Sequence, residues 1–566
     1  MKKSILYILA ASALMLTACD DLLDKTPRDT FSNTQAFWNN SDQVKSYSNG
    51  FYEYYVGYGT EAGWFYFKTL NDDQANPSFT NWTYLNVPNK ASDWSGKFTN
   101  IRRVNYMLDG LKGSSLPAAD KAKYIGIGRL NRAWEYYQLV REYGDVQWES
   151  SVITTPDDPA TYGERTNEDA VMDSVLADLD YAIANIPEGS GKFLFSKQMA
   201  LAMKSDICLY YGTYAKYRTA ADNGHAADNA VAQKFLQESV KASEALMGAG
   251  YKLTTNYGEI YNALDLSKSS EVIFARHYEQ DVVGHGLADY TCGSTTQSGI
   301  TKDAIDAFLF LDGKPKASTT YDTDDRVVAN KDGDGSIAHL LAKKDKRLSV
   351  LVDSIVSYKN HGWTRVDPNG AVTLPAQMTS STGYTILKYD NASMPTVYRT
   401  STVGNYTDAP LYWYAVILLN EAEAKAELGT ITQTDLDKTV NLLQARAGLP
   451  AMTVSPEADP ANNHGVSNLL WEIRRCRRCE LMTDNWYRYW DLVRWHQLDK
   501  LDSQKYPDIN HGANLSAVDH TGSTVDANGY RLATEATRTF AAKYYHYPVP
   551  TNEITLNPSI KQNPGW

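Results

Sequence analysis

The sequence predicts a mainly α-helical protein in which a large, irregular insert with short strands separates two helical parts. Apolar residues recur every three to four positions through much of residues 36–253 and again through residues 411–566, which is the spacing of a buried helix face. Between them, residues 254–410 are rich in Gly, Ser, Thr and Asp, and helical spacing is rare. The 566 residues suffice for a large core and more than one structural unit.

The composition argues against a nucleic-acid-binding protein. The formal net charge is −12 and the pI is about 5.4. The sequence has no basic patch with interleaved aromatic residues, so we expect no nucleic-acid partner. The counts of tyrosine (39) and tryptophan (13) are high. Such residues suit either tight helix packing or a surface that stacks on flat ligands.

Residues 1–18 are predicted to be a signal peptide rather than part of the fold. Two lysines precede an uncharged apolar run over residues 5–16, which is too short to span a membrane as a stable helix. Leu-Thr-Ala-Cys follows at positions 16–19 and resembles the lipidation site of bacterial lipoproteins. We therefore expect Cys19 to carry acyl chains that anchor the protein in a membrane, and residues 19–35 to form a tether.

The N-terminal helical part, residues 36–253, is predicted to contain a series of helices. Their expected ranges are 36–58, 94–108, 120–146, 167–186, 196–219 and 228–249. Antiparallel helical pairs of this length, rich in Tyr and Ala, resemble degenerate tetratricopeptide repeats. We therefore expect the helices to stack into a tetratricopeptide-like superhelical scaffold.

The insert and the C-terminal part are predicted to differ in their elements. Within the insert, residues 271–275 are a short strand candidate because they are apolar and β-branched. The C-terminal part begins with a helix expected over residues 411–428. A later helix is expected to end at Gly448, where glycine can take the left-handed cap conformation and Pro450 stops the helix.

The stretch 471–495 combines an arginine-rich half with an aromatic half. Four arginines fall within five positions, and the spacing allows Arg477 to pair with Glu480, and Asp484 with Arg488, along one helix. The second half carries Met, Trp, Tyr and Val at helical spacing. We expect a helix held by ion pairs on one side and by a core on the other.

This stretch resembles the C-terminal signature of the SusD/RagB family of lipoproteins. The matching residues are Ile473, Arg474, Arg477, Arg478, Glu480, Leu481, Arg488, Trp490, Asp491, Leu492, Arg494 and Trp495. Cys476 stands where the family usually has Glu, Asn485 stands where it prefers Gly, and the turn is one residue longer. The helix ends at residues 143–146 and 446–450 and the tail at 547–566 are also similar to the family.

The resemblance implies a glycan-binding lipoprotein on the outer face of the bacterial outer membrane, with a SusC-like TonB-dependent transporter as its partner. Asp20 and Asp21 are similar to a surface-export signal of this family's bacteria. Two alternatives stay open: a peptide- or glycopeptide-binding RagB-like lipoprotein, and an all-helical glycoside hydrolase. The sequence contains no nucleophile elbow, zinc-protease motif or phosphate-binding loop. We therefore predict no enzyme activity and no cofactor.

Two short motifs resemble parts of metal sites. Residues 330–341 resemble the start of a calcium loop, but Leu341 occupies the position where a bidentate Glu is required. An Asp-Gly turn is the favoured interpretation, and calcium remains an alternative. Cys476 and Cys479 offer two ligands on a helix, but a zinc site needs two more and the sequence has no second pair at ligand spacing. We predict no metal site there.

The loop over residues 63–88 is the predicted ligand site, because it places aromatic residues in a polar segment without helical spacing. The aromatic candidates are Trp82, Trp64, Tyr66, Tyr84, Tyr290 and Trp363, and the polar candidates are Asp72, Asp73, Asn76 and Arg365. Trp82 is the first choice. The alternative for each aromatic residue is packing within its loop. The hypothesis requires loop 63–88 and residues 277–365 to converge on one face.

Overall fold

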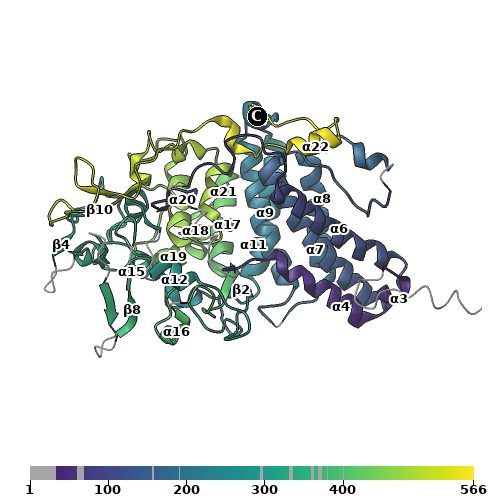
Figure 1. Cartoon of the computed structure of the whole chain (residues 1–566), viewed down its shortest axis with the longest axis horizontal. Coiled ribbons are helices and arrows are strands. Elements are labelled where there is room, and N and C mark those ends of the chain that lie inside the picture. The colour runs from purple at the N-terminus through teal and green to yellow at the C-terminus, as the bar shows by residue number, and fades with distance from the viewer. Residues whose placement is uncertain are drawn as a thin grey trace, which may run out of the picture.

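The computed structural model describes residues 33–59, 69–78, 80–155, 158–189, 191–292, 298–329, 335–358, 363–366, 372–378, 380–399 and 401–566. Long helices gather in one half of the molecule, and the other half consists of short helices, short strands and irregular segments (Figure 1). This arrangement confirms the predicted class, a helical scaffold with a loop-rich insert. No helix within the described ranges is long and apolar enough to cross a membrane.

The described α-helices are α3 (Gln35–Trp38), α4 (Ser41–Asn49), α6 (Ser92–Lys112), α7 (Ala118–Tyr143), α8 (Glu168–Asn185), α9 (Lys197–Tyr217), α10 (Ala220–Asn223), α11 (Asn229–Met247), α12 (Leu287–Cys292), α13 (Lys302–Ala307), α14 (Ala338–Leu341), α15 (Lys346–Leu351), α16 (Thr396–Arg399), α17 (Tyr414–Glu427), α18 (Gln433–Lys438), α19 (Val440–Ala447), α20 (Asn468–Glu480), α21 (Tyr487–Arg494) and α22 (Thr551–Leu556). The described 3₁₀ helices are η1 (Gly50–Tyr54), η2 (Pro159–Tyr162), η3 (Tyr257–Ile260), η4 (Leu498–Leu501), η5 (Pro507–Ile509) and η6 (Ala542–Tyr545).

The described strands are short and form small antiparallel pairs and one three-stranded sheet. They are β1 (Gln74–Ala75), β2 (Val272–Arg276), β3 (Gly299–Ile300), β4 (Val328–Ala329), β5 (Gly335–Ser336), β6 (Ile355–Val356), β7 (Trp363–Val366), β8 (Val372–Met378), β9 (Ala409–Trp413), β10 (His511–Asn514) and β11 (Tyr530–Leu532). The pairs are β1–β3, β2–β9, β7–β8 and β10–β11, and β4, β5 and β6 form the sheet.

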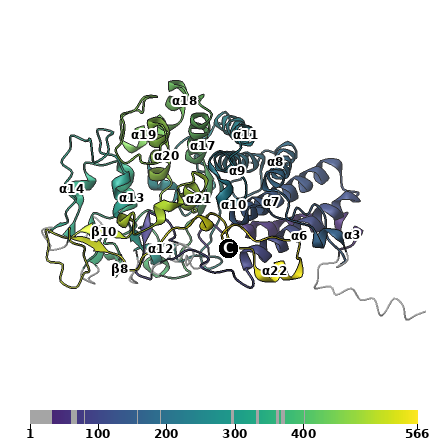
Figure 2. The same ribbon diagram turned by 90° about the horizontal axis from the view of Figure 1, so that it is seen from above.

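The long helices pack against their neighbours in chain order: α6 on α7, α7 on α8, α8 on α9, and α9 on α11. Seen from above, they form one side of the molecule, with α17 and α20 next to them (Figure 2). Side-chain caps fix several starts: Asn167 accepts from the backbone N–H of Asp169 at α8, and Asp228 accepts from that of Ala230 at α11. Five of the six predicted helices agree with α6, α7, α8, α9 and α11 to within a few residues. The range 36–58 is divided between α3, α4 and η1.

The start of the C-terminal helical part differs from the prediction. Residues 409–413 form β9, which pairs antiparallel with β2, so that Trp413 lies opposite Val272. The helix α17 therefore begins at Tyr414 rather than at 411. The aromatic residues before Tyr414 are buried in this pair of strands, and the tertiary contact overrides the helical spacing. The short strand expected at residues 271–275 is confirmed by β2.

The stretch 471–495 forms two helices, α20 and α21, joined by a sharp turn. Thr483, Asn485 and Trp486 have positive φ angles of 69°, 40° and 62°. Gly448 has a φ of 75° and ends α19, as predicted.

The two ion pairs predicted within this stretch are wrong. Arg477 pairs with Asp491 at 2.9 Å, and Glu480 pairs with Arg347 at 2.8 Å. Similarly, Asp484 pairs with Lys388 at 2.7 Å and Arg488 pairs with Asp72 at 2.6 Å. The charged groups of this stretch form ion pairs between different elements of the fold, not pairs along one exposed helix. The stretch therefore links several segments of the protein to one another.

The C-terminal tail returns to the N-terminal helices, where α22 lies close to α6 (Figure 2) and the backbone N–H of Thr551 donates to the Pro88 carbonyl at 3.0 Å. The backbone N–H of Tyr547 donates to the Glu142 carbonyl at 2.6 Å, and the Asn563 side chain donates to the Tyr143 carbonyl at 3.0 Å. These contacts close the end of α7, next to the cavity described below.

Candidate functional site

A cavity of about 550 Å³ lies between the N-terminal helices and the turn that precedes α21. Its walls come from η1, from loop residues 70–83, from α7 and α9, and from residues 483–494. Such a volume is typical of small-molecule sites in proteins. The cavity thus brings together segments that lie hundreds of residues apart in the chain.

The wall of the cavity is unusually aromatic. Its tyrosines and tryptophans are Tyr54, Tyr55, Trp134, Tyr137, Tyr210, Tyr412, Trp486, Tyr487, Tyr489, Trp490 and Tyr547. Aromatic rings present a flat apolar face together with a hydroxyl or indole N–H at the edge. This combination suits a ligand that is both ring-shaped and polar.

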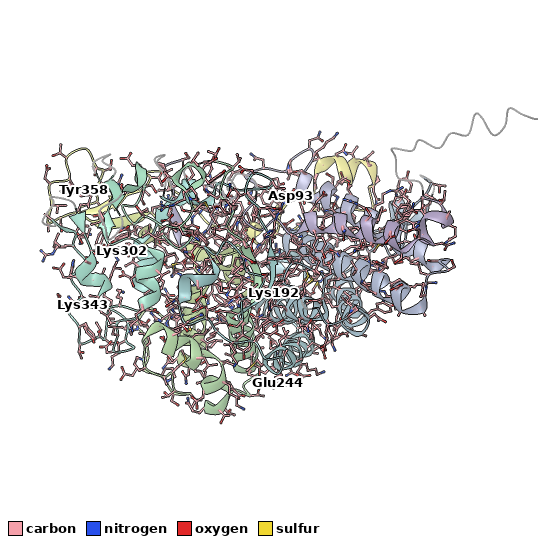
Figure 3. All side chains as sticks on the ribbon, turned by 90° about the horizontal axis from the view of Figure 1, so that it is seen from below. Asp93, Lys192, Glu244, Lys302, Lys343 and Tyr358 are labelled. Atoms are coloured by element: carbon pink, nitrogen blue, oxygen red, sulfur yellow. The ribbon has the colours of Figure 1, made fainter. Side chains whose placement is uncertain are left out.

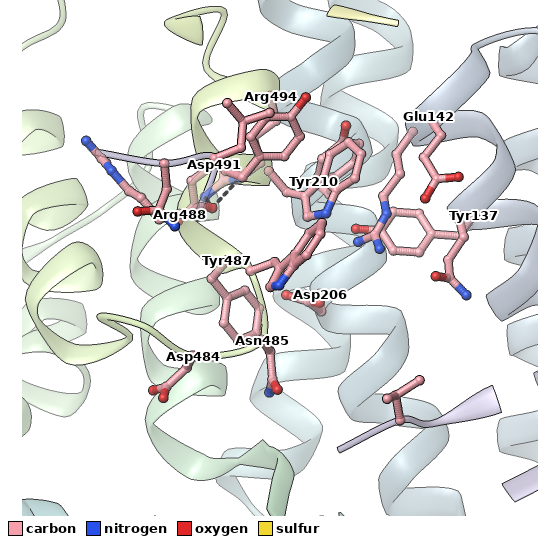
Figure 4. A pocket seen from close by; sticks show the side chains of 18 of the residues that line it. Tyr137, Glu142, Asp206, Tyr210, Asp484, Asn485, Tyr487, Arg488, Asp491 and Arg494 are labelled. Atoms are coloured by element: carbon pink, nitrogen blue, oxygen red, sulfur yellow. Dashed lines mark hydrogen bonds and ion pairs between the residues drawn. The ribbon is translucent and has the colours of Figure 1, made fainter. Parts of the chain in front are cut away.

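Helical spacing explains why these side chains meet. Trp134, Tyr137 and Arg141 follow one another at intervals of three and four on α7, so they share one helix face. Asp206 and Tyr210 do the same on α9. Figure 4 shows Tyr137 of α7 and both labelled residues of α9 facing the cavity opposite α21.

The turn before α21 supplies the third wall. The left-handed backbone of Trp486 reverses the chain at the start of α21. Trp486 and Tyr487 therefore line the cavity, and both are half-buried. The guanidinium carbon of Arg477 lies 5.2 Å from the centroid of the Tyr487 ring, and this cation–π contact helps to hold the ring in place.

A buried charge network holds the loop at the edge of the cavity. Arg488 donates two hydrogen bonds of 2.6 Å to Asp72, and Arg478 donates one of 2.8 Å to Asp73. Burial tends to raise the pKa of Asp72, but Arg478 and Arg488 outweigh it and hold that pKa below its usual value. Asp303 also accepts from Arg478, at 2.7 Å. The loop is fixed to the helical scaffold by these pairs.

Glu142 and Asp206 are among the other carboxylates that line the cavity. Glu142 pairs with Lys97 at 2.7 Å, and burial raises the pKa of Glu142. Burial also raises the pKa of Asp206, whose side chain is 13% exposed and lies 4.0 Å from Arg477. Both can accept hydrogen bonds from ligand hydroxyl groups.

Trp82, the first choice as a stacking residue, is buried by the structure. It is 5% exposed, its indole N–H donates to the Thr539 carbonyl at 2.8 Å, and its ring stacks on Tyr544 with centroids 4.4 Å apart. This residue does not line the cavity. The Trp82 ring packs between the loop and the C-terminal segment. The expected open ring face for a sugar is therefore absent at this residue.

The other described residues of the predicted loop are also engaged in packing. The Tyr84 hydroxyl donates to Asp93 on the first turn of α6 (Figure 3) at 2.8 Å. The Asn76 amide donates to the hydroxyls of Thr69 and Thr80, at 2.5 and 2.9 Å. Neither side chain lines the cavity.

Of the polar candidates, Asp73 alone is part of the cavity wall within the described chain. The carboxylates of Asp72 and Asp73 are bound to arginines and thereby hold the loop in place. Tyr290 lies on α12, is half-buried and packs against the main core.

Some predicted residues fall outside what the structure describes. Cys19, Trp64 and Tyr66 lie outside the described ranges, as do residues 330–334 of the calcium alternative. Trp363 and Arg365 belong to β7, which pairs with β8, but their side chains are not described.

The structure does bring loop 63–88 into contact with the insert. Gln74 and Ala75 of β1 pair with Ile300 and Gly299 of β3. The Thr301 hydroxyl donates to the Asp72 carbonyl at 2.6 Å. The two segments therefore converge, but they do so through backbone pairing next to the cavity.

Sequence reasoning missed most of the cavity wall because its aromatic residues lie at helical spacing. The spacing of Trp134 and Tyr137 predicts a scaffold helix, and that of Trp486 and Trp490 predicts a core stripe. A usable signal was present: the wall uses tyrosine and tryptophan where an ordinary core would use leucine. The Tyr54 and Tyr210 hydroxyls are buried without a hydrogen-bond partner among the described residues.

The structure describes Cys476 and Cys479 as buried, free thiols on α20. Burial raises the pKa of Cys476 to about 11 and that of Cys479 to about 12. In the described part of the chain, no cluster of three or more His, Cys, Asp or Glu residues is arranged to hold a metal ion.

Comparison with known proteins identifies the family. A model of the SusD family matches residues 270–566, and a model described as "Starch-binding associating with outer membrane" matches residues 21–209. SusD-like protein P38 of Formosa agariphila is 23% identical over 512 residues, covering 87% of this chain and 91% of its own length.

Solved structures share the fold. A SusD-like carbohydrate binding protein from Bacteroides fragilis is 21% identical, with a TM-score of 0.69 over 93% of this chain and 100% of its own. A laminarin binding SusD-like protein is 17% identical, with a TM-score of 0.54 over 93% of this chain and all of its own. The SusD family model alone covers more than half of the sequence, and the chain described here belongs to the SusD family.

Proposed function

We propose that this protein is a lipid-anchored glycan receptor on the outer face of the outer membrane. It binds oligosaccharides without cleaving them and passes them to a SusC-like TonB-dependent transporter. The observation that carries the proposal is the aromatic cavity, which combines flat rings from six separate segments in a member of a family described as starch-binding and associating with the outer membrane.

The chemistry of the cavity favours a sugar ligand. A pyranose ring stacks its apolar face on an aromatic side chain, and burial of this face contributes roughly 1–2 kcal/mol for each ring. Trp134, Trp486 and Tyr487 are half-buried and line the cavity, so their rings are available at its wall. Asp206 and Gln138, also in the wall, can bond the hydroxyl groups at the ring edge.

The position on the cell rests on the sequence around Cys19 and on the family. Cys19 follows an apolar signal-like run, and Asp20 and Asp21 come directly after it. Several acyl chains give stable anchoring, whereas a single chain is marginal.

The binding proposal is tested by screening the chain from Cys19 onward, without its signal peptide, against neutral and acidic polysaccharides by affinity gel electrophoresis and calorimetry. Retardation by at least one polysaccharide is expected, and no new reducing ends should form. Binding of a peptide mixture but of no glycan would favour the RagB-like alternative. Release of reducing ends would favour the hydrolase.

The partner is tested by gentle detergent extraction of the native membrane and affinity purification. A large outer-membrane transporter is expected to copurify. Repeated recovery of the protein alone under these conditions would contradict the proposed transfer step.

A further inference from the structure

The Arg141 side chain occupies a distinctive position in the cavity wall. It lies near the end of α7, with its guanidinium carbon 4.3 Å from the ring centroid of Trp490 and 5.0 Å from that of Tyr137. Guanidinium groups stack on aromatic faces in this way and keep their hydrogen-bond donors at the edge of the stack. The two rings therefore fix the orientation of a cation at the cavity.

The other cationic side chains of the cavity wall are each bonded to a carboxylate. The pairs are Lys97–Glu142 at 2.7 Å, Arg477–Asp491 at 2.9 Å, Arg488–Asp72 at 2.6 Å and Arg494–Glu423 at 2.7 Å. For Arg141, no carboxylate oxygen of the described residues lies within 4.0 Å. Among the described residues its hydrogen-bond partner is the neutral Tyr137 hydroxyl, and its Nε is buried without one. The carboxylates of Glu142 and Asp206 act on Arg141 only electrostatically, from beyond 4.0 Å.

A cavity-wall guanidinium without an ion-pair partner is suited to binding an anion. A guanidinium stays charged at any physiological pH and offers donors in a fork that matches two oxygens of a carboxylate or sulfate. Taking such a charge out of water without a counter-charge is costly, and a bound anion recovers much of that cost through charge-assisted hydrogen bonds.

We propose that the cavity selects acidic glycans, and that the Arg141 guanidinium binds their carboxylate or sulfate group. This inference rests on the proposed glycan-binding function and adds the chemical class of the ligand. A uronic acid carboxylate and a sulfate ester present the same pair of acceptor oxygens, so the structure assigns the shared chemistry and the experiment separates the two sources.

Two carboxylates that act on Arg141, Glu142 and Asp206, oppose a bound anion in this cavity; Glu142 is paired with Lys97, which leaves Asp206. Its carboxylate lines the same wall from α9, and Figure 4 shows it below Tyr210. Its nearest cation among the described residues is Arg477, at 4.0 Å. Removal of its negative charge in Asp206→Asn is therefore expected to strengthen binding of an acidic glycan.

The test uses the chain from Cys19 onward and six probes. Polygalacturonate and alginate carry carboxylates, carrageenan and dextran sulfate carry sulfate esters, and laminarin and starch are neutral. The protein should bind one acidic class and not the neutral probes, and the affinity should fall with added NaCl. Arg141→Gln should weaken this binding about tenfold or more, Arg141→Lys should weaken it less, and Asp206→Asn should strengthen it.

Arg102→Gln is the matched control, because Arg102 is an exposed arginine that also lies over a tyrosine ring, 5.2 Å from the centroid of Tyr106. It removes the same charge away from the cavity and should leave the affinity unchanged. If Arg141→Gln does not fold, as judged by circular dichroism, the response to Asp206→Asn decides.

The outcomes separate the two proposals. Binding of neutral probes only, or of acidic probes with unchanged affinity in Arg141→Gln, overturns the acidic-ligand inference and leaves the glycan-binding function standing. If the folded protein binds none of the six probes, the acidic-ligand inference is overturned. The proposed glycan-binding function is then also overturned for the carboxylated, sulfated and neutral glycans tested.

Discussion

The guanidinium of Arg488 binds the carboxylate of Asp72 through two parallel hydrogen bonds of 2.6 Å, although 416 residues separate them in the chain. Asp72 lies in the loop that edges the cavity, and Arg488 lies on α21, which forms another of its walls. Arg478 and Lys500 also face Asp72, at 3.3 and 3.7 Å. This pair therefore sets the geometry of the cavity by joining the first and last parts of the fold.

Asp72→Asn is expected to lower the free energy of unfolding by ~3–5 kcal/mol near neutral pH, because it leaves buried arginine charges without their counter-charge. Denaturation in urea followed by tryptophan fluorescence measures the change. Asp173→Asn is the control, since Asp173 pairs with Lys234 at 2.6 Å on the exposed surface. That change should cost less than ~1 kcal/mol. Equal effects of the two substitutions would contradict a stabilising role for the buried pair.

The same pair predicts a pH dependence. The arginines hold the pKa of Asp72 below its ordinary value of 3.8, so the folded protein keeps the carboxylate ionised where the unfolded chain takes up a proton. The stabilisation is complete above the unfolded pKa and is lost as the pH falls below it. The difference in unfolding free energy between wild type and Asp72→Asn should shrink below about pH 4. If the difference in unfolding free energy instead grew as the pH fell, the predicted stabilisation by ionised Asp72 would be contradicted.

Trp82→Ala is expected to destabilise the fold rather than to remove a sugar platform. The substitution leaves a large void against Tyr544 and frees the Thr539 carbonyl, at a cost of ~3–5 kcal/mol. Chemical denaturation measures this loss, and calorimetry with a bound glycan measures the affinity of the folded fraction. An unchanged stability with a strongly reduced affinity would restore Trp82 as a ligand-binding residue.

Trp134→Ala is expected to weaken glycan binding about tenfold, or ~1.4 kcal/mol, because it removes a half-buried ring from the cavity wall. Trp148→Ala provides the comparison. Trp148 is also half-buried and packs on Tyr136, 4.2 Å between centroids, but it lies outside the cavity. Calorimetry on both variants should show reduced affinity for the first and wild-type affinity for the second. Equal affinities would exclude Trp134 from the site.

Cys19→Ala is expected to abolish labelling of the protein by a radioactive or clickable fatty acid, since Cys19 is the residue expected to carry the acyl chains. Cys208→Ala removes a buried thiol of α9 and should leave labelling intact. Protease added to intact cells should digest the wild-type protein if it faces outward. Full protection in unpermeabilised cells would contradict the surface position.

The sequence alone determined the class of the fold and most helix positions. The spacing of apolar residues and the caps at residues such as Asn167 and Gly448 act over one or two turns, so a reader of the sequence can use them. The arginine-rich stretch likewise carried the family resemblance, which the family model confirms over residues 270–566. Helical spacing gave the wrong element where a distant segment of the chain pairs with the predicted helix. Residues 411–413 form a strand because β2 pairs with them.

Tertiary structure decided which side chains face the cavity and which partners the charges take. Trp82 lies in a polar loop but is buried by Tyr544, whereas Trp134 lies in a regular helix and lines the cavity. Arg488 pairs with Asp72 instead of with Asp484, four positions away. Burial and ion pairing depend on which segments meet in space, and a helix period specifies only which residues share a face. The helices could therefore be read from the chain, while the binding cavity required the fold.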